Sequence, residues 1–235
     1  MVKLIHAADL HLDSPFSGLS PELAAQRRSE QRQLLERLSA LARERGADAV
    51  LLSGDLLDSG RTFRETAQTL ATQLGSTGCP VFISPGNHDC YTDHSPYSTL
   101  EWPENVHIFT SEQVEGIPLL DKTCVIHGAA FCAPRLERSP LVGFSAPKDG
   151  NIHVMALHGE VDSDGGYGPI FTADIAASGL NYLALGHVHQ CSGLQKAGDT
   201  FWAYPGCPEG RGFDETGEKG ALVVRAAPGQ VEAAF

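Results

Sequence analysis

The stretch VKLIHAADLH, residues 2–11, opens the chain with an apolar run that ends in an aspartate and a histidine. Residues 2–8 have the length and apolar character of a buried β-strand. Asp9 and His11 follow that run directly. In α/β folds, ligand sites gather at the carboxyl ends of parallel strands. The stretch therefore predicts the first strand of an α/β sheet and the first side chains of a site.

The first ninety residues alternate between strand-like and helical patterns. Residues 20–46 begin with Ser-Pro, which is typical of a helix N-cap followed by proline at the first helical position, and their leucine face ends near Gly46. The alternation continues with an expected strand at 47–53, a helix at 62–74 and a strand at 80–84. This order favours an α/β fold that starts with parallel strands.

After Asn105 the pattern changes to more closely spaced β-like runs, with one further helix expected at about 172–178. The expected strands are residues 106–109, 123–127, 152–157, 182–185, 201–204 and 221–225. Residues 133–151 are rich in proline, glycine and serine, which predicts a long loop. Long loops in compact domains are more often functional than idle.

Composition narrows the class of protein. A chain of 235 residues with 42% hydrophobic content predicts one large domain over residues 1–235. The N-terminus lacks the apolar region of a signal peptide and no run reaches membrane-spanning length, so we expect a soluble, cytoplasmic protein. The six scattered cysteines favour free thiols. The net charge of −12 argues against a broadly basic nucleic-acid surface, although bound dications would offset part of it locally.

Polar side chains recur where five expected strands end. The stretches are Asp9-x-His11, Gly54-Asp55-x-x-Asp58, Gly86-Asn87-His88-Asp89, His158-Gly159 and Gly186-His187-Val188-His189. Each one alone has an ordinary explanation as a turn residue or a loop histidine. Because they follow successive strands of one fold, we expect them to meet at one edge. Together they supply enough oxygen and nitrogen ligands for two divalent metals.

The ligand types indicate the chemistry. Carboxylate, imidazole and amide groups suit Mn²⁺, Fe²⁺ or Zn²⁺, and the absence of cysteine ligands argues against a purely structural zinc site. Two such metals about 3.5–4 Å apart can share a hydroxide and hold the phosphoryl oxygens during in-line attack. The motifs therefore predict hydrolysis of a phosphate ester.

The ordered motifs, from residue 9 to residue 189, resemble those of the calcineurin-like metallophosphoesterase superfamily. The resemblance implies a four-layer α-β-β-α sandwich of two mixed sheets, with two metals at the strand ends. Carried onto this chain, it assigns the first metal to Asp9, His11, Asp55 and His189. It assigns the second metal to Asp55, Asn87, His158 and His187, so that Asp55 is the bridge.

Two residues are candidates for catalytic roles beside the ligands. His88 is not needed as a ligand, which makes it the candidate for stabilising the transition state and donating a proton to the leaving oxygen. Asp58 would hydrogen-bond the His88 ring and fix its tautomer, or cap its own loop. For Asp89 we expect a turn or capping role rather than catalysis.

Two further assignments concern residues outside these motifs. His127 precedes Gly128 as His158 precedes Gly159, but His158 better matches the lone histidine of the family pattern. Arg211 is expected to be a solvated loop charge, with a contact to substrate phosphate as the alternative.

Both ends of the chain are similar to the SbcD-type DNA-repair exonucleases. The similarity lies in IHAADLHLD (residues 5–13), YPG (204–206), GFDE (212–215) and Lys219-Gly. It implies manganese as the metal, DNA as the substrate and an SbcC-like ATPase as a partner. SbcD-type proteins continue into a capping region and a partner-binding segment, whereas this sequence stops at Phe235. This difference argues against DNA as the substrate, but the resemblance still makes a two-metal, exonuclease-like phosphodiesterase the expected function.

Two other functions remain open from the sequence. One is a phosphodiesterase or phosphatase for nucleotides or other small esters. The other is a non-catalytic scaffold, although a scaffold has no chemical need for a bridging carboxylate. A phosphoprotein phosphatase is disfavoured, because Ser59 rather than arginine follows Asp58.

Overall fold

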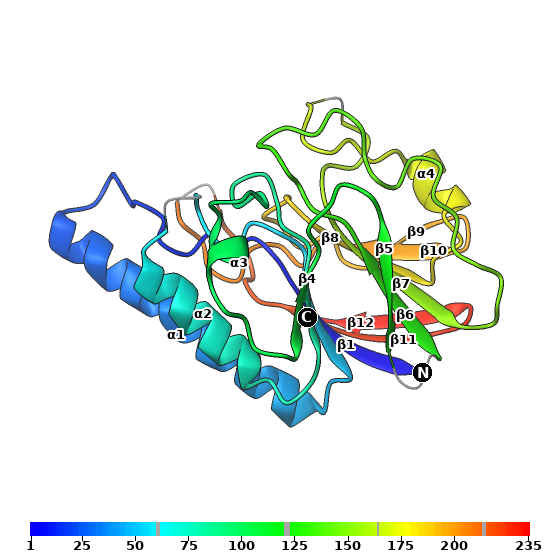
Figure 1. The fold of residues 1–235 in the computed structure, drawn as a ribbon, viewed down its shortest axis with the longest axis horizontal. Helices are drawn as coiled ribbons and strands as arrows, with labels where there is room; N and C mark the ends of the chain where they lie inside the picture. The colour runs from blue at the N-terminus through cyan, green and yellow to red at the C-terminus, as the bar shows by residue number, and fades with distance from the viewer. Residues whose placement is uncertain (60–61, 120–122, 164, 213–214) are drawn as a thin grey trace.

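A computed structural model describes residues 1–59, 62–119, 123–163, 165–212 and 215–235. Two six-stranded sheets lie face to face, with α1 (Pro21–Arg45) and α2 (Arg64–Gly75) on one outer side. Figure 1 shows these two helices side by side, with α4 (Thr172–Ala177) at the far side of the molecule. The expected sandwich of two mixed sheets is confirmed.

The first sheet has the strand order β12-β11-β1-β2-β3-β4. Its strands are β1 (Val2–Ala7), β2 (Ala49–Leu52), β3 (Val81–Ile83), β4 (Val106–Ile108), β11 (Leu222–Ala227) and β12 (Gln230–Ala234). Strands β1 to β4 pair in parallel, as the alternating sequence pattern predicts, with Leu4 opposite Ala49. β11 pairs antiparallel with β1, and β12 antiparallel with β11.

The second sheet has the strand order β5-β6-β7-β8-β10-β9. Its strands are β5 (Glu115–Leu119), β6 (Cys124–Gly128), β7 (Ile152–His158), β8 (Tyr182–Gly186), β9 (Gln195–Ala197) and β10 (Thr200–Ala203). The four central strands are parallel, and both edge strands pair antiparallel. The carboxyl ends of β7 and β8 therefore lie at one edge of this sheet.

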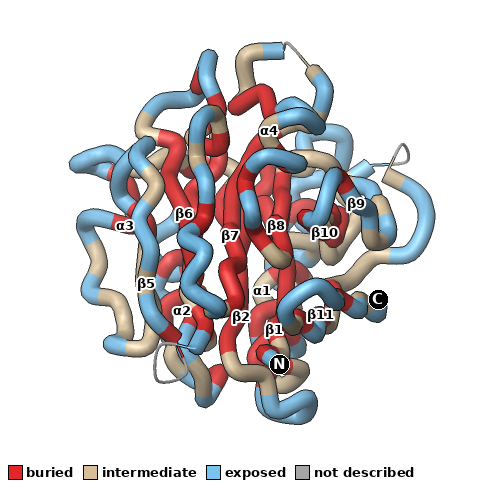
Figure 2. Tube along the Cα trace, turned by 90° about the vertical axis from the view of Figure 1, so that its right-hand side faces the viewer, coloured by how far each residue is buried: buried red, intermediate tan, exposed pale blue. Residues whose placement is uncertain are grey.

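Three hydrophobic layers hold the sandwich together. Alternate residues of β2 serve two of them, because successive side chains of a strand point to opposite faces. Ala49 and Leu51 pack between the sheets, whereas Val50 and Leu52 pack against α1 and α2. The third layer covers the outer face of the second sheet, where Ile175 of α4 joins the core. Figure 2 shows β7 and β8 as the buried centre, surrounded by exposed loops.

Helix α1 has the ends that the sequence predicts. The Ser20 side chain accepts a hydrogen bond from the Leu23 backbone N–H, and Pro21 occupies the first turn. At the other end Gly46 has a φ of 56°, and its N–H bonds the carbonyls of Ala42 and Arg43. None of the described helices is long and apolar enough to cross a membrane.

Four elements were not expected from the sequence. Three are the edge strands β5, β9 and β12, and the fourth is the short helix α3 (Pro96–Thr99). An edge strand is covered on fewer sides, so its residues need not form the apolar run by which a central strand is recognised. Glu115 and Gln195, which begin β5 and β9, are accordingly exposed.

Candidate metal centre

The predicted ligands lie in loops or strand ends that the two sheets bring to one edge. Asp9 and His11 follow β1, Asp55 follows β2, and Asn87 follows β3. His158 is the last residue of β7, whereas His187 and His189 follow β8. Among the contacts that join the sheets here, the His187 backbone nitrogen lies 3.1 Å from the Asp9 carboxylate, and His158 Nδ1 lies 2.9 Å from the Ser53 carbonyl oxygen.

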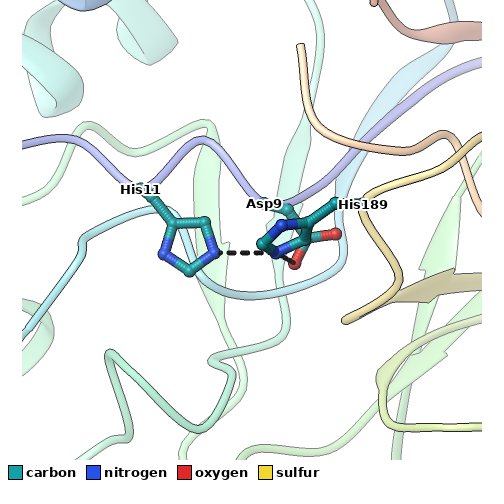
Figure 3. A group of neighbouring side chains, drawn as sticks. All are labelled: Asp9, His11 and His189. Carbon is teal, nitrogen blue, oxygen red and sulfur yellow. Dashed lines mark hydrogen bonds and ion pairs between the residues drawn. The ribbon is translucent and has the colours of Figure 1, made fainter. Parts of the chain in front are cut away.

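The first group of ligands comprises Asp9, His11 and His189 (Figure 3). The Nε2 atoms of the two histidines lie 3.2 Å apart, and His189 Nε2 lies 3.9 Å from Asp9 Oδ1. Asp9 and His11 are buried, and each is 1% exposed. Two imidazole nitrogens that face one another beside a buried carboxylate form a set that a divalent cation fits.

The second group comprises Asp55, His158 and His187. His187 Nδ1 and His158 Nε2 lie 3.3 Å apart. Asn87 Oδ1 lies 2.9 Å from the same His158 nitrogen, so the predicted amide ligand belongs to this group as well. All the donor atoms are oxygen or imidazole nitrogen, the types that Mn²⁺, Fe²⁺ and Zn²⁺ accept.

Asp55 lies between the two groups. Its Oδ2 atom is 3.7 Å from His11 Nε2 on one side and 3.4 Å from His158 Nε2 on the other. Its Oδ1 atom accepts a 2.9 Å hydrogen bond from the His88 backbone N–H, which fixes the orientation of the carboxylate. A carboxylate that bridges two metals has to lie between their two ligand groups, as Asp55 does.

The backbone is strained at several predicted ligands. Left-handed φ angles occur at Asp9 (55°), His11 (44°), Asp55 (52°) and His187 (107°). Residues other than glycine rarely adopt such angles. The conformation costs free energy and persists only because the surrounding structure fixes it. Gly86 is required nearby, because an added Cβ would collide with the Asp55 carboxylate. Strain of this kind concentrates at functional sites.

The Asp89 carboxylate organises the Asp55 loop. It accepts hydrogen bonds from the backbone N–H groups of Asp55, Leu56, Leu57 and Gly86. The Tyr97 hydroxyl donates a further bond of 2.6 Å. Asp89 therefore has the turn-forming role that the sequence favours.

His88 is exposed and faces a cleft beside the two groups. Its Nδ1 lies 3.0 Å from the backbone carbonyl oxygen of Asp58. The expected hydrogen bond from the His88 ring to the Asp58 carboxylate is therefore wrong, because the ring bonds the backbone carbonyl of Asp58 instead. That carboxylate instead accepts hydrogen bonds of 3.0 Å from Ser14 Oγ and Arg211 Nη1, and its Oδ1 atom lies 3.2 Å from His11 Nδ1.

Arg211 is not a solvated loop charge. It is 23% exposed, and its guanidinium contacts both Asp58 and Glu215. Glu215 Oε1 in turn lies 2.6 Å from His189 Nδ1. Sequence reasoning missed Glu215 as a site residue, although it falls within the GFDE stretch. Phe213 and Asp214 of that stretch lie outside the described residues.

Charge at the centre is balanced by neighbouring groups. Burial raises the pKa of Asp9 to about 8. Burial also opposes ionisation of Asp55, but the positive charge of His158 outweighs it and holds the pKa of Asp55 below its usual range. Burial alone would lower the pKa of His158, yet the Asp55 and Asp9 carboxylates raise it to about 9. In the metal-free protein a protonated His158 thus supplies positive charge that a cation could replace.

His127, the alternative to His158, lies outside both groups. Its Nε2 atom contacts His153 Nδ1 at 2.9 Å, and His153 Nε2 contacts Asp149 Oδ1 at 3.0 Å. This chain of contacts is formed within the second sheet and the loop before β7. The structure therefore brings His158, and not His127, to the other predicted ligands.

A cleft of about 740 Å³ opens next to His88. Its lining includes Ser14, Phe16, Leu19, Arg27, His88 and Arg211. The Arg27 guanidinium pairs with Glu30 and Glu209, as Arg211 pairs with Asp58 and Glu215. The cleft thus combines apolar walls with two arginines whose charges are already matched.

A site of this composition on a double-sheet sandwich is typical of the metal-dependent phosphoester hydrolases. The sequence profile of the calcineurin-like phosphoesterases matches residues 2–191, and the chain belongs to this family. The family uses a dinuclear centre of divalent metals, and the two groups above could hold it.

Individual relatives agree with the family. The chain is 34% identical over 244 residues to the uncharacterized metallophosphoesterase YhaO of Bacillus subtilis strain 168, covering 98% of this chain and 59% of that protein. It is 24% identical over 271 residues to a subunit of the nuclease SbcCD from the same organism, with 97% and 67% covered. It is 27% identical over 226 residues to the DNA double-strand break repair protein Mre11 of Aeropyrum pernix, with 88% and 53% covered. The chain thus spans between about half and two thirds of these relatives.

A solved structure shares the fold. The protein TT1561 of Thermus thermophilus superimposes with a TM-score of 0.58 over 99% of this chain and 98% of its own. The sequence identity is 12%, so this likeness concerns the fold alone.

Proposed function

We propose that this chain is a nuclease-like phosphodiesterase that cleaves DNA at a centre of two divalent metals. The observation that carries the proposal is the position of Asp55 between two ligand groups, with His88 beside it at the mouth of a cleft. Manganese is the metal we favour, with Fe²⁺ or Zn²⁺ as alternatives, since the oxygen and imidazole donors suit all three.

Different residues would hold each of the two cations. When bound, two divalent cations lower the pKa of water and offset charge on the phosphoryl oxygens. Asp9, His11 and His189 would hold the first cation, while Asn87, His158 and His187 would hold the second. Asp55 would contact both.

His88 would act on the leaving oxygen. A backbone carbonyl only accepts hydrogen bonds, so Nδ1 of His88 donates to Asp58 and carries a proton. The Nε2 atom is then the one available to the substrate. In the imidazolium form it can donate a hydrogen bond, and finally a proton, to the oxygen that departs.

DNA as the substrate is supported by the relatives named as part of a nuclease and as a double-strand break repair protein. The net charge of −12 leaves little electrostatic attraction for a phosphate backbone. We therefore expect a partner, of the SbcC-like ATPase kind, to supply much of the DNA-binding surface.

A second candidate is hydrolysis of small nucleotide esters. The paired state of Arg27 and Arg211 favours it, because neither guanidinium is free to neutralise an extended row of phosphates. The apolar wall around Phe16 and Leu19 would instead suit one nucleoside.

One comparison of substrates separates these functions. The purified chain with Mn²⁺ is assayed on single-stranded DNA, double-stranded DNA, a cyclic nucleotide and a chromogenic phosphodiester, with Asp55→Asn as the inactive control. We expect release of nucleotides from DNA even without the partner, because the ligand groups and His88 all lie on this chain, as well as hydrolysis of the chromogenic ester. Turnover confined to the small esters would overturn the nuclease proposal and leave the second candidate.

A further inference from the structure

We propose that Asp58, Arg211 and Glu215 form an outer clamp that holds His11 and His189 in the orientation needed to bind the first metal. The inference rests on the metal centre of the proposed function and concerns how one half of it is positioned. None of the three residues is among the metal ligands predicted above.

Glu215 sets the orientation of His189. Its Oε1 atom lies 2.6 Å from His189 Nδ1, a distance at which a carboxylate accepts a hydrogen bond from a nitrogen that carries a proton. Arg211 Nη2 also lies 3.3 Å from Nδ1, but a guanidinium has only hydrogens to offer and the shorter contact decides the tautomer. With its proton on Nδ1, His189 presents the lone pair of Nε2 toward Asp9 and His11.

Asp58 lies behind His11. Its Oδ1 atom is at ion-pair distance, 3.2 Å, from His11 Nδ1, which is buried and makes no hydrogen bond within the described residues, while His11 Nε2 faces His189 Nε2. The Ser14 hydroxyl donates to the same Asp58 oxygen at 3.0 Å. Carboxylates that bind the outer nitrogen of a histidine ligand fix its tautomer and raise its basicity.

Arg211 connects the two carboxylates. Its Nη1 atom lies 3.0 Å from Asp58 Oδ1, its Nη2 atom lies 3.3 Å from Glu215 Oε1, and its backbone N–H donates to Glu215 Oε2 at 2.7 Å. The side chains of Asp58 and Glu215 are 19% and 13% exposed, so the three groups are largely shielded from water. The loop after β2 is thereby joined to the segment after β10.

The second ligand group is held differently. His158 Nδ1 contacts the backbone carbonyl of Ser53, which no side-chain substitution in the clamp removes. The clamp therefore acts on one metal site and not on the other. This asymmetry distinguishes positioning from a general effect on folding, which would weaken both sites.

Calorimetric titration of the metal-free chain with Mn²⁺ tests the clamp. We expect wild type to bind two ions, and Glu215→Gln and Arg211→Gln to bind one of them about 10- to 100-fold more weakly, as for other supporting residues of metal sites. The affinity for the second ion should not change. Glu209→Gln is the matched control, because Glu209 also pairs with an arginine, Arg27, but contacts no predicted ligand.

The thermal midpoint of each metal-free variant gives the second measurement. The clamp predicts midpoints close to wild type alongside the selective loss of affinity. If Glu215→Gln binds each of the two ions as tightly as wild type does, the clamp is overturned, but the proposed metal centre is not. A parallel loss at both sites would also overturn it, in favour of a structural role. A wild-type chain that binds no Mn²⁺ would overturn the clamp and the proposed function together.

Discussion

The imidazole of His88 is held by the backbone of Asp58, because its Nδ1 donates a 3.0 Å hydrogen bond to the Asp58 carbonyl oxygen. The Asp58 side chain is free for another task, and it contacts His11 and Arg211. Asp58 therefore serves two parts of the site, one through its backbone and one through its side chain. The backbone of Asp58 orients the proton donor, and its side chain supports a metal ligand.

Replacement of His88 should separate metal binding from hydrolysis. His88→Ala removes the donor to the leaving oxygen but none of the predicted ligands, so we expect both metals to stay bound while kcat falls by about 10²- to 10⁴-fold. Asp55→Asn should lose metal and turnover together. Metal content and steady-state rates measure the two effects, and undiminished metal-dependent turnover in His88→Ala would refute its role.

Replacement of Asp89 should destabilise the Asp55 loop. Asp89→Asn exchanges an acceptor of four backbone N–H groups for an amide with one oxygen, and we expect a loss of about 1.5–3 kcal/mol in the free energy of unfolding. Tyr97→Phe removes only the 2.6 Å hydroxyl bond and should cost less. Denaturant unfolding in the presence of EDTA measures both, and an Asp89→Asn protein as stable as wild type would contradict this role.

Gly186 should not tolerate a side chain. A Cβ there would collide with the carbonyl oxygen of Ser53, the residue that directly follows β2 of the facing sheet. Gly186→Ala should therefore lower the free energy of unfolding by about 1–3 kcal/mol. Gly18→Ala is the control, since nothing lies within 4 Å of the added atom. Equal stability of the two variants would show that the sheets can separate at this point without cost.

Two buried histidines outside the metal centre, His6 and His127, should each lower the stability of the metal-free chain in acid. Burial, and then the neighbouring His153, lower the pKa of His127 to about 4, while burial lowers the pKa of His6 to about 3. The unfolded chain binds these protons near the ordinary pKa of about 6.5, before the folded chain does. The stabilisation is therefore complete above about 6.5 and is lost as the pH falls toward 4.

Denaturant unfolding in EDTA at several pH values between about 7 and about 4.5 measures this loss. His127→Gln removes one of the two groups, so its free energy of unfolding should depend less steeply on pH than that of wild type. The same slope in both proteins would show that His127 is not responsible.

The central strands of both sheets, and the polar residues at their ends, could be predicted from the sequence, because each depends on a local pattern. A buried apolar run followed by a polar residue identifies β1 and Asp9 without knowledge of any partner. Three of the four edge strands, β5, β9 and β12, could not be predicted in this way. β12, for example, is recognised as a strand only by its pairing with β11.

The clamp could not be predicted for a related reason. Arg211 and Asp58 are 153 positions apart in the sequence, and no periodic pattern relates the two. The direction of the Asp58 side chain depends on that distant arginine and on His11. Sequence reasoning accordingly connected Asp58 to His88, which lies nearby, through the wrong atom.

Anomalous diffraction from crystals grown with Mn²⁺ would show the two-metal centre itself, because it locates each metal and the atoms around it. We expect two manganese peaks, one beside Asp9, His11 and His189 and one beside Asn87, His158 and His187, with the Asp55 carboxylate in contact with both. A single peak, or two peaks that Asp55 does not join, would contradict the two-metal centre.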